Sequence, residues 1–357
     1  MKKFILVLSC ILIFSSLTKA ASSVTSSQPN IVFIFSDDHA TQALSAYGHE
    51  ISKIAQTPHI DKVATQGIRF DRCLVGNSIC GPSRATILTG TYSHINKFYS
   101  NERTAFDGSQ PTFPKILQAN NYQTALIGKW HLASDPTGFD HWEILPGQGS
   151  YYNPDFVTPN GTHREEGYVS ELVTKKALTW LDHQRNENQP FLLMVQHKAP
   201  HRDWSPAPKY LDLYDDVIFP EPDTLFDDYA GRGSAARDQD MTIDKSMFLG
   251  SDLKVDAFFT NRYERMNDAQ IKIFKKAYTS ENKFLLENQL SGKELVRWKY
   301  QRYLKDYLRC VKSVDDCVGE LWNWLDERDM LDNTIFVYSS DQGFYLGEHG
   351  WFDKRFM

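Results

Sequence analysis

The segment Cys80-Gly81-Pro82-Ser83-Arg84 carries the most reactive combination of side chains in this sequence of 357 residues. Proline is favoured in the first turn of a helix, so Pro82 predicts a helix here with residue 80 just before its N-terminus. Free backbone N–H groups and the helix dipole attract anions to such a position. The segment therefore predicts a nucleophile beside an anion-binding site. The alternative is that Cys80 is a small buried residue at an ordinary helix start.

Two adjacent carboxylates, Asp37 and Asp38, directly follow an apolar run that predicts a buried strand. Neighbouring carboxylates repel each other unless a cation lies between them. A hard divalent ion, which prefers oxygen ligands, removes this repulsion. The pair therefore predicts a metal site, the alternative being that both acids are solvated loop residues.

Four short apolar runs bounded by polar residues predict buried parallel strands, at residues 30–35, 124–127, 191–196 and 334–338. Polar or charged residues follow each run at once, among them Asp37, Lys129, His201 and Asp341. Ligands of open α/β sheets bind at the carboxyl ends of the strands. We therefore expect these four segments to place their side chains at one end of the sheet.

Apolar residues at helical spacing predict helices between these runs, at 114–120, 168–184 and 299–327. The alternation of strands and helices predicts an α/β fold with a doubly wound, mostly parallel sheet flanked by helices. The segment at about 204–292 is rich in Asp, Pro and charged residues and has weak periodicity. We interpret it as a polar insertion that carries a helix at 268–288.

The Cys80 segment, continued by Leu88-Thr89-Gly90, resembles the C-x-P-S-R signature and the downstream L-T-G of the formylglycine-dependent type I sulfatases of the alkaline phosphatase superfamily. The resemblance implies that a maturation enzyme oxidises Cys80 to formylglycine (3-oxoalanine), whose hydrated aldehyde attacks sulfur with Arg84 beside it. It also implies a Ca²⁺ site formed by Asp37, Asp38, residue 80, Asp341 and Gln342. Glutamine is less usual than asparagine or histidine at the last of these places, but its carbonyl oxygen can bind a hard metal.

Further segments match the family in order along the chain, so that the resemblance runs from Asn30 to Arg355. They are Gly128-Lys129-Trp130-His131-Leu132, Lys198-Ala199-Pro200-His201 and the stretch 347–355. The resemblance implies that they supply four more catalytic residues: Lys129, His131, His201 and Lys354. The lysines would neutralise charge on the sulfate oxygens, His201 would protonate the departing oxygen, and His131 would act as a base.

The resemblance is closest to bacterial exported sulfatases that act on host glycans, including N-acetylglucosamine-6-sulfatases. It implies hydrolysis of sulfate esters on glycosaminoglycan or mucin-type carbohydrates, with 6-O-sulfated N-acetylglucosamine as the first choice. We expect sugar contacts in the aromatic-rich stretch 142–156 and in the 204–292 segment. Two alternatives remain: a phosphodiesterase or phosphonate ester hydrolase of the same superfamily, and a non-catalytic protein that binds sulfated glycans.

Charge and cysteine content limit the other functions. Lys and Arg total 39 against 45 Asp and Glu, a net charge of −6, which argues against a nucleic-acid partner because no global positive field would hold phosphates. Five cysteines are too few for a disulfide framework in a chain of this size. Cys310 and Cys317 lie too far apart along one predicted helix to bridge each other, so we expect both in the core.

The N-terminus resembles a targeting signal. Lys2 and Lys3 precede an apolar run at 4–14, which predicts a signal peptide at 1–20 and export to the periplasm or the medium. A lipid anchor at Cys10 is the alternative. No apolar run is long enough to span a bilayer. We expect residues 21–357 to form a sulfatase catalytic domain truncated at its C-terminal end, because the family continues with a smaller antiparallel subdomain.

Overall fold

A computed structural model describes residues 28–102, 104–256 and 263–355 of the chain. The predicted signal peptide, Cys10 and Met357 lie outside these residues. Within the described ranges, no helix combines the length and the apolar character needed to cross a membrane.

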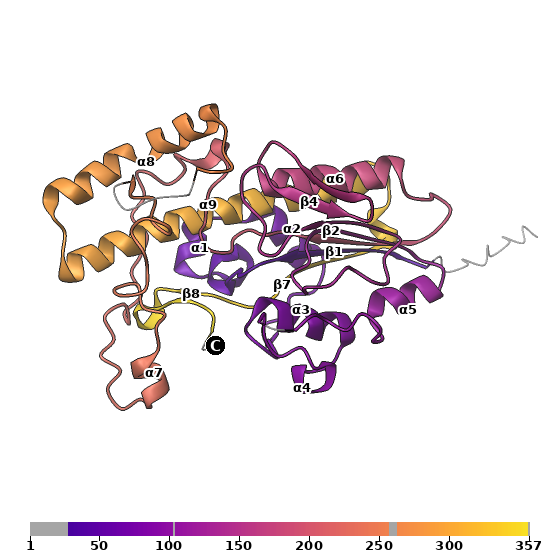
Figure 1. Cartoon of the computed structure of the whole chain (residues 1–357), viewed down its shortest axis with the longest axis horizontal. Coiled ribbons are helices and arrows are strands. Elements are labelled where there is room, and N and C mark those ends of the chain that lie inside the picture. The colour runs from indigo at the N-terminus through magenta and orange to yellow at the C-terminus, as the bar shows by residue number, and fades with distance from the viewer. Residues whose placement is uncertain (1–27, 103, 257–262, 356–357) are drawn as a thin grey trace, which may run out of the picture.

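A seven-stranded sheet in the order β5-β4-β3-β2-β6-β1-β7 forms the centre of the molecule (Figure 1). All four predicted strands are present, as β1 (Asn30–Ser36), β2 (Gln123–Lys129), β6 (Phe191–Gln196) and β7 (Thr334–Ser340). β6 pairs with β2 and β1, and β1 pairs with β7, in each case in parallel. The carboxyl ends of these four strands therefore meet at one end of the sheet, as the sequence predicts.

Three strands were not predicted: β3 (His141–Leu145), β4 (Asp155–Thr158) and β5 (Gly161–Arg164). β3 extends the parallel sheet beside β2, whereas β4 and β5 add an antiparallel edge. Every residue of β5 is exposed, so this strand lacks the apolar alternation that would reveal it in the sequence. The sheet remains mostly parallel, as expected.

The aromatic-rich stretch 142–156, where we expect sugar contacts, places three of its aromatic side chains in the core. Tyr151, Tyr152 and Phe156 are at most 5% exposed. The hydroxyl of Tyr151 donates to the carbonyl of His201, and the hydroxyl of Tyr152 donates to the carbonyl of Pro206, both at 2.6 Å. These aromatic side chains therefore hold neighbouring loops in place rather than facing a ligand.

The predicted helices are present as α5 (Phe113–Ala119), α6 (Val169–His183), α8 (Asp268–Asn288) and α9 (Gly292–Asp326). α9 begins at Gly292 rather than Lys299, and its first two turns contact the 204–292 segment through Lys293 and Arg297, which lie over the ring of Phe226. The remaining helices are α1 (Glu50–Ile54), α2 (Pro58–Gln66), α3 (Cys80–Thr89), α4 (Ser93–Asn96) and α7 (Ser234–Asp238). The short elements are η1 (Thr41–Ala43), η2 (Ser45–Tyr47), η3 (Pro208–Tyr210), η5 (Leu331–Asn333), β8 (Tyr345–Leu346), η6 (Glu348–Gly350) and β9 (Phe352–Asp353).

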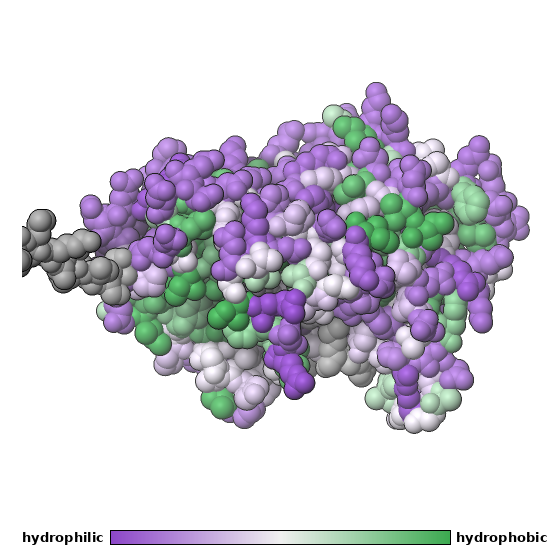
Figure 2. Space-filling model, turned by 180° about the vertical axis from the view of Figure 1, so that it is seen from behind, coloured by the Kyte–Doolittle hydropathy of each residue, from purple (hydrophilic) through white to green (hydrophobic). Residues whose placement is uncertain are grey.

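Buried hydrophobic residues form two clusters, and alternate side chains of one strand belong to different clusters. Leu193 and Val195 of β6 join the larger cluster with α6 and α9, whereas Leu192 and Met194 join the smaller cluster with α3. Alternate side chains of a strand point to opposite faces, so this division places helices on both faces of the sheet. Cys310 and Cys317 are buried and free, as expected. Seen from behind, the surface is mostly hydrophilic with separate hydrophobic patches (Figure 2).

The 204–292 segment is polar in composition but packs tightly on α9. It contributes Phe219, Ile243 and Leu253 to the larger cluster, and α8 runs beside α9 (Figure 1). Asp306 of α9 is completely buried and connects α9 with the 204–292 segment. Its carboxylate lies 2.9 Å from Lys254 Nζ and 3.0 Å from Arg309, and it accepts a hydrogen bond from the hydroxyl of Tyr278 of α8 at 2.9 Å.

We predict that Asp306→Ala lowers the free energy of unfolding by about 3–5 kcal/mol, because it removes the buried carboxylate that compensates two buried cations. The measurement is urea denaturation followed by circular dichroism. Asp326→Ala, an exposed acid at the end of the same helix, is the matched control and should change stability by less than about 0.5 kcal/mol. Equal small losses in both variants would show that the Asp306 contacts do not attach the segment to α9.

Candidate functional site

The candidate residues from the sequence come together at the carboxyl end of the parallel strands. Asp37 follows β1, Lys129 ends β2, and Asp341 follows β7. α3 begins at Cys80. The fold therefore brings together residues that are distant in the sequence, because parallel strands end at the same side of a sheet.

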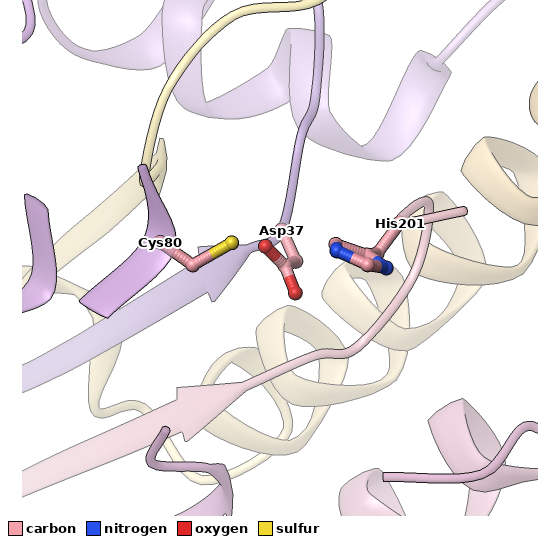
Figure 3. Close-up of side chains that lie close together, drawn as sticks. All are labelled: Asp37, Cys80 and His201. Carbon is pink, nitrogen blue, oxygen red and sulfur yellow. The ribbon is translucent and has the colours of Figure 1, made fainter. Parts of the chain in front are cut away.

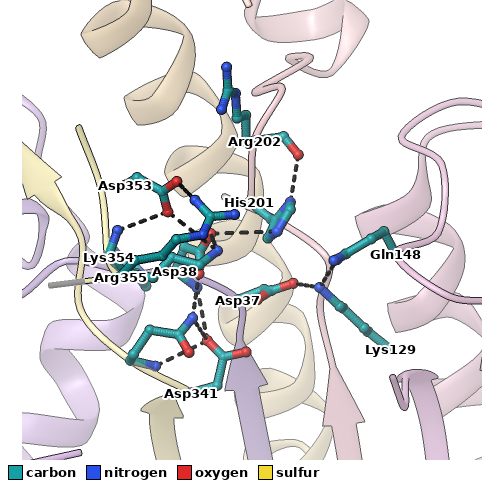
Figure 4. Close-up of polar contacts among 12 residues, drawn as sticks. Asp37, Asp38, Lys129, Gln148, His201, Arg202, Asp341, Asp353, Lys354 and Arg355 are labelled. Atoms are coloured by element: carbon teal, nitrogen blue, oxygen red, sulfur yellow. Dashed lines mark hydrogen bonds and ion pairs between the residues drawn. The ribbon is translucent and has the colours of Figure 1, made fainter. Parts of the chain in front are cut away.

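Three buried carboxylates form the centre of the site. Side-chain oxygens of Asp37, Asp38 and Asp341 lie within 4.8 Å of one another, and each residue is at most 1% exposed. Three cations balance them. Lys129 pairs with Asp37, and Lys354 Nζ lies 2.5 Å from Asp38 (Figure 4). Arg84 lies 3.0 Å from Asp341. Buried carboxylates are stable only when such partners accompany them.

The guanidinium of Arg84 connects three strand ends. Its Nη1 donates to the carbonyl of Lys129 at 2.6 Å and to Oε1 of Gln196 at 2.7 Å, at the ends of β2 and β6. Its Nε and Nη2 donate to Oδ2 of Asp341, beyond β7, at 3.1 and 3.0 Å. Only a planar group with several donors can make these contacts at once.

The donor atoms at the acidic cluster suit a hard divalent cation. Oδ1 of Asp37 and Oε1 of Gln342 are buried and have no hydrogen-bond partner among the described residues. The amide nitrogen of Gln342 donates to Asp38 and, at 2.6 Å, to Asp341. The carboxylate oxygens of Asp37, Asp38 and Asp341 form an all-oxygen donor set, which is the set that Ca²⁺ prefers, and a rotation of the Gln342 amide would turn its unpartnered carbonyl oxygen toward them. The residues present therefore fit the calcium ion that the resemblance implies.

Cys80 lies directly beside this cluster. Its sulfur, the Asp37 carboxylate and the His201 ring lie within 4.8 Å of one another, and the side chains point toward one another (Figure 3). Burial raises the pKa of the Cys80 thiol to about 12. The unmodified thiol is therefore protonated at pH 7 and is a weak nucleophile.

Both candidate histidines border the same space. Nε2 of His201 lies 3.7 Å from Asp38, and its Nδ1 lies 2.5 Å from the carbonyl of Arg202. The ring of His131 interacts electrostatically with Lys129, Arg84 and Asp341, and its backbone carbonyl lies beside Gly81. Burial lowers the pKa of His131 to about 3 and also lowers the pKa of His201. Both rings are therefore neutral at pH 7 in this state.

Comparison with known proteins agrees with this arrangement. Residues 29–355 match the model of the family described as Sulfatase. The chain belongs to the sulfatase family.

Individual relatives within this family are similar over most of the chain. The N-acetylglucosamine-6-O-sulfatase of Bacteroides thetaiotaomicron is 50% identical over 345 residues, and the human N-acetylglucosamine-6-sulfatase is 26% identical over 354 residues. Each comparison covers 92% of this chain. The chain spans 61% of the length of the bacterial relative and 54% of the human one.

A solved structure supports the fold in detail. It is described as a protein in complex with its substrate D-glucosamine-2-N,6-O-disulfate, and it superimposes on this sulfatase-family chain with a TM-score of 0.89 at 49% identity. The match covers 92% of this chain and 68% of that one. The α/β fold with a mostly parallel sheet flanked by helices is therefore that of known sulfatase structures.

The sequence analysis missed three polar residues that contact the site. Gln148 accepts a hydrogen bond from Lys129 Nζ at 2.5 Å, Gln196 accepts from Arg84, and Asn101 accepts from the N–H of Gly81 at 3.0 Å. Gln196 could have been found, because it is the one polar residue at the end of an apolar strand. Gln148 follows the unpredicted strand β3, and Asn101 lies in a loop, so neither had a comparable signal.

We predict that Arg84→Lys lowers the free energy of unfolding by about 2–3 kcal/mol, because an ammonium cannot reach all three strand ends and leaves buried partners of Arg84 without a donor. Chemical denaturation of the variant measures the loss. Arg164→Lys is the control, since Arg164 also pairs with an aspartate but is exposed, and its effect should stay within about 0.5 kcal/mol. Similar losses at both positions would show that Arg84 acts as a simple charge.

Proposed function

We propose that this chain carries the catalytic machinery of a sulfatase that hydrolyses sulfate esters on sulfated carbohydrates, with 6-O-sulfated N-acetylglucosamine as the preferred substrate. The observation that carries the proposal is the position of Cys80, at a helix N-terminus and within 4.8 Å of the acidic cluster residue Asp37. The names of the bacterial and human relatives and the sulfated glucosamine in the solved structure support the choice of sugar.

We propose that a maturation enzyme converts Cys80 to formylglycine, because a thiol cannot form the geminal diol that the reaction requires. When present, formylglycine supplies a hydrated aldehyde as the nucleophile, and Ca²⁺ supplies positive charge that lowers the pKa of its hydroxyl. Asp37, Asp38, Asp341 and Gln342 would hold the calcium, with residue 80 beside them. A cation there favours the Gln342 orientation that presents the carbonyl oxygen, since the amide N–H groups would be repelled.

Lys129 and Lys354 are proposed to bind the sulfate oxygens. In the structure they pair with Asp37 and Asp38. A divalent cation at these carboxylates would weaken both ion pairs, which frees the two ammonium groups for an incoming anion. α3 begins at Cys80, so the positive end of its dipole lies beside the same place and favours negative charge there.

His201 and His131 are proposed to move protons. His201 would donate a proton to the departing sugar oxygen, and the negative charge of a bound sulfate ester favours this role because it raises the pKa of the ring. His131 would accept a proton from the nucleophile in the step that releases sulfate. The neutral state of His131 is the state that this role needs.

The cellular setting follows from the N-terminal pattern. We propose that residues 1–20 are a signal peptide and that the protein is exported, a location suited to sulfated glycans outside the cell. The partners are then the maturation enzyme and the carbohydrate substrate.

We predict that the full chain, produced with a formylglycine-generating enzyme, releases inorganic sulfate from N-acetylglucosamine-6-sulfate with a higher kcat/KM than from galactose-6-sulfate or N-acetylgalactosamine-6-sulfate. Peptide mass spectrometry should show oxygen in place of sulfur at residue 80, and turnover should scale with the extent of this exchange. Cys80→Ala should lower kcat by at least about 10³-fold, because it removes the nucleophile.

Other outcomes of this experiment would contradict the proposal. Faster hydrolysis of phosphate diesters than of sulfate esters would favour the phosphodiesterase alternative. Binding of sulfated sugars without sulfate release would indicate a non-catalytic protein. Activity on aryl sulfates alone would refute the carbohydrate substrate, and full activity with unmodified Cys80 would refute the nucleophile.

We also predict that chelation of calcium lowers both the melting temperature and the activity, since a ligand bound only by the native state stabilises it by mass action. Mg²⁺ should restore less than Ca²⁺, because it demands stricter octahedral geometry. Asp37→Ala should lose the calcium-dependent rise in melting temperature, whereas the exposed Asp332→Ala should retain it. Normal calcium content in Asp37→Ala would show that the ligands are misassigned.

A further inference from the structure

We propose that Tyr307 of α9 is a positioning residue for the acidic cluster, which holds the backbone of Asp38 and the loop after β7 in the arrangement that calcium requires. The inference rests on the calcium site of the proposed function. Tyr307 is buried and contacts no carboxylate oxygen among the described residues. It would nevertheless set how tightly the site binds calcium.

The hydroxyl of Tyr307 bridges two backbone groups of the loop after β1. It accepts a hydrogen bond from the N–H of Ala40 at 2.7 Å and donates one to the carbonyl of Asp38 at 2.7 Å. Tyr307 is completely buried. No water competes for these groups, so removal of the hydroxyl would leave both backbone groups without this partner inside the protein.

The loop needs such a restraint because of the conformation of Asp38. Its φ is +66°, in the left-handed region that side chains with a Cβ rarely adopt. The chain leaves β1 and must turn sharply here so that the carboxylate of Asp38 faces that of Asp341. Tyr307 holds the turn at two points, the carbonyl of Asp38 at the bend and the N–H of Ala40 two residues later.

The ring of Tyr307 contacts the second loop of the site. It stacks on Phe344 with ring centroids 5.5 Å apart and an interplanar angle of 22°. Phe344 is 1% exposed and lies two residues after Gln342, on the loop that also carries Asp341. One side chain from α9 therefore contacts both loops that supply the proposed ligands.

The hydrogen bonds of Tyr307 differ in kind from the hydrogen bond that joins the two loops directly. The N–H of Asp38 donates to Oδ1 of Asp341 at 3.0 Å, so that link uses a carboxylate oxygen that a cation would also attract. The Tyr307 hydroxyl is neutral and bonds only to backbone groups, so its contacts persist whether the carboxylates face lysine or calcium. The long helix α9, packed against α6 and α2, supplies a rigid support for it (Figure 1).

The test compares Tyr307→Phe with Tyr300→Phe. Tyr300 is also fully buried on α9, and its hydroxyl donates to the carbonyl of Pro220 at 2.7 Å, away from the acidic cluster. Each variant removes one buried hydroxyl and keeps the ring. The measurements on the full chain are the calcium Kd by titration against a chelating dye, the free energy of unfolding without calcium, and kcat and KM at increasing calcium.

Tyr307→Phe should weaken calcium binding about five- to tenfold, the effect expected from losing one or two buried hydrogen bonds in the binding-competent loop. Its kcat should return to the wild-type value at saturating calcium, with KM unchanged. Tyr300→Phe should lose comparable stability but keep the wild-type calcium Kd.

Wild-type calcium affinity in folded Tyr307→Phe, or an equal loss of affinity in both variants, would overturn the positioning role and leave the proposed function intact. A wild-type protein that binds no calcium would instead refute the calcium site, and this inference with it. If Tyr307→Phe does not fold, Phe344→Leu takes its place, because it removes the stacking partner. An unchanged calcium Kd in Phe344→Leu would then overturn the inference.

Discussion

Compensation of buried charge at the carboxyl end of the sheet is the constraint on which this structure depends. Asp37, Asp38 and Asp341 are removed from water almost completely, and each is stable only because Lys129, Lys354 or Arg84 is buried beside it. These six residues lie at or just after the ends of four strands and on one helix. A shift of any of these elements would therefore separate a charge from its partner. Arg84 is central, since its guanidinium bonds to the ends of β2 and β6 and to the loop after β7.

The same charge balance explains how the site would respond to its ligands. Each of the three carboxylates has one cationic partner, so their charges largely offset one another. A bound Ca²⁺ would make the site positive, which favours the anionic sulfate ester that the proposed function requires. The lysines that stabilise the carboxylates in this state are then those that would contact the sulfate oxygens. In the proposed function, stability of the fold and recognition of the substrate would therefore use one set of side chains.

The local patterns predicted much of the fold and of the site. The four buried strands were recognisable because parallel strands with both faces covered are apolar throughout, as in Phe191–Gln196. The start of α3 at Cys80 was recognisable from Pro82. The exposed strand β5 was not, since its residues Gly161–Arg164 bury no side chain. The buried role of Tyr151 and Tyr152 was also missed, because aromatic residues suit both a core and a sugar-binding surface.

The sequence by itself determined the family resemblance, the order of the four central strands and of the four longest predicted helices, and the identity of the charged residues, because these depend on residue types and on spacing over a few turns. Only the tertiary structure decided which charges meet. The pairing of Lys129 with Asp37, the contact of Gln148 with Lys129 and the bridge from Tyr307 to Asp38 join residues from 19 to 269 positions apart. Such contacts carry no local pattern. They follow from strand order, helix direction and the exclusion of water, which arise only when the whole chain is packed.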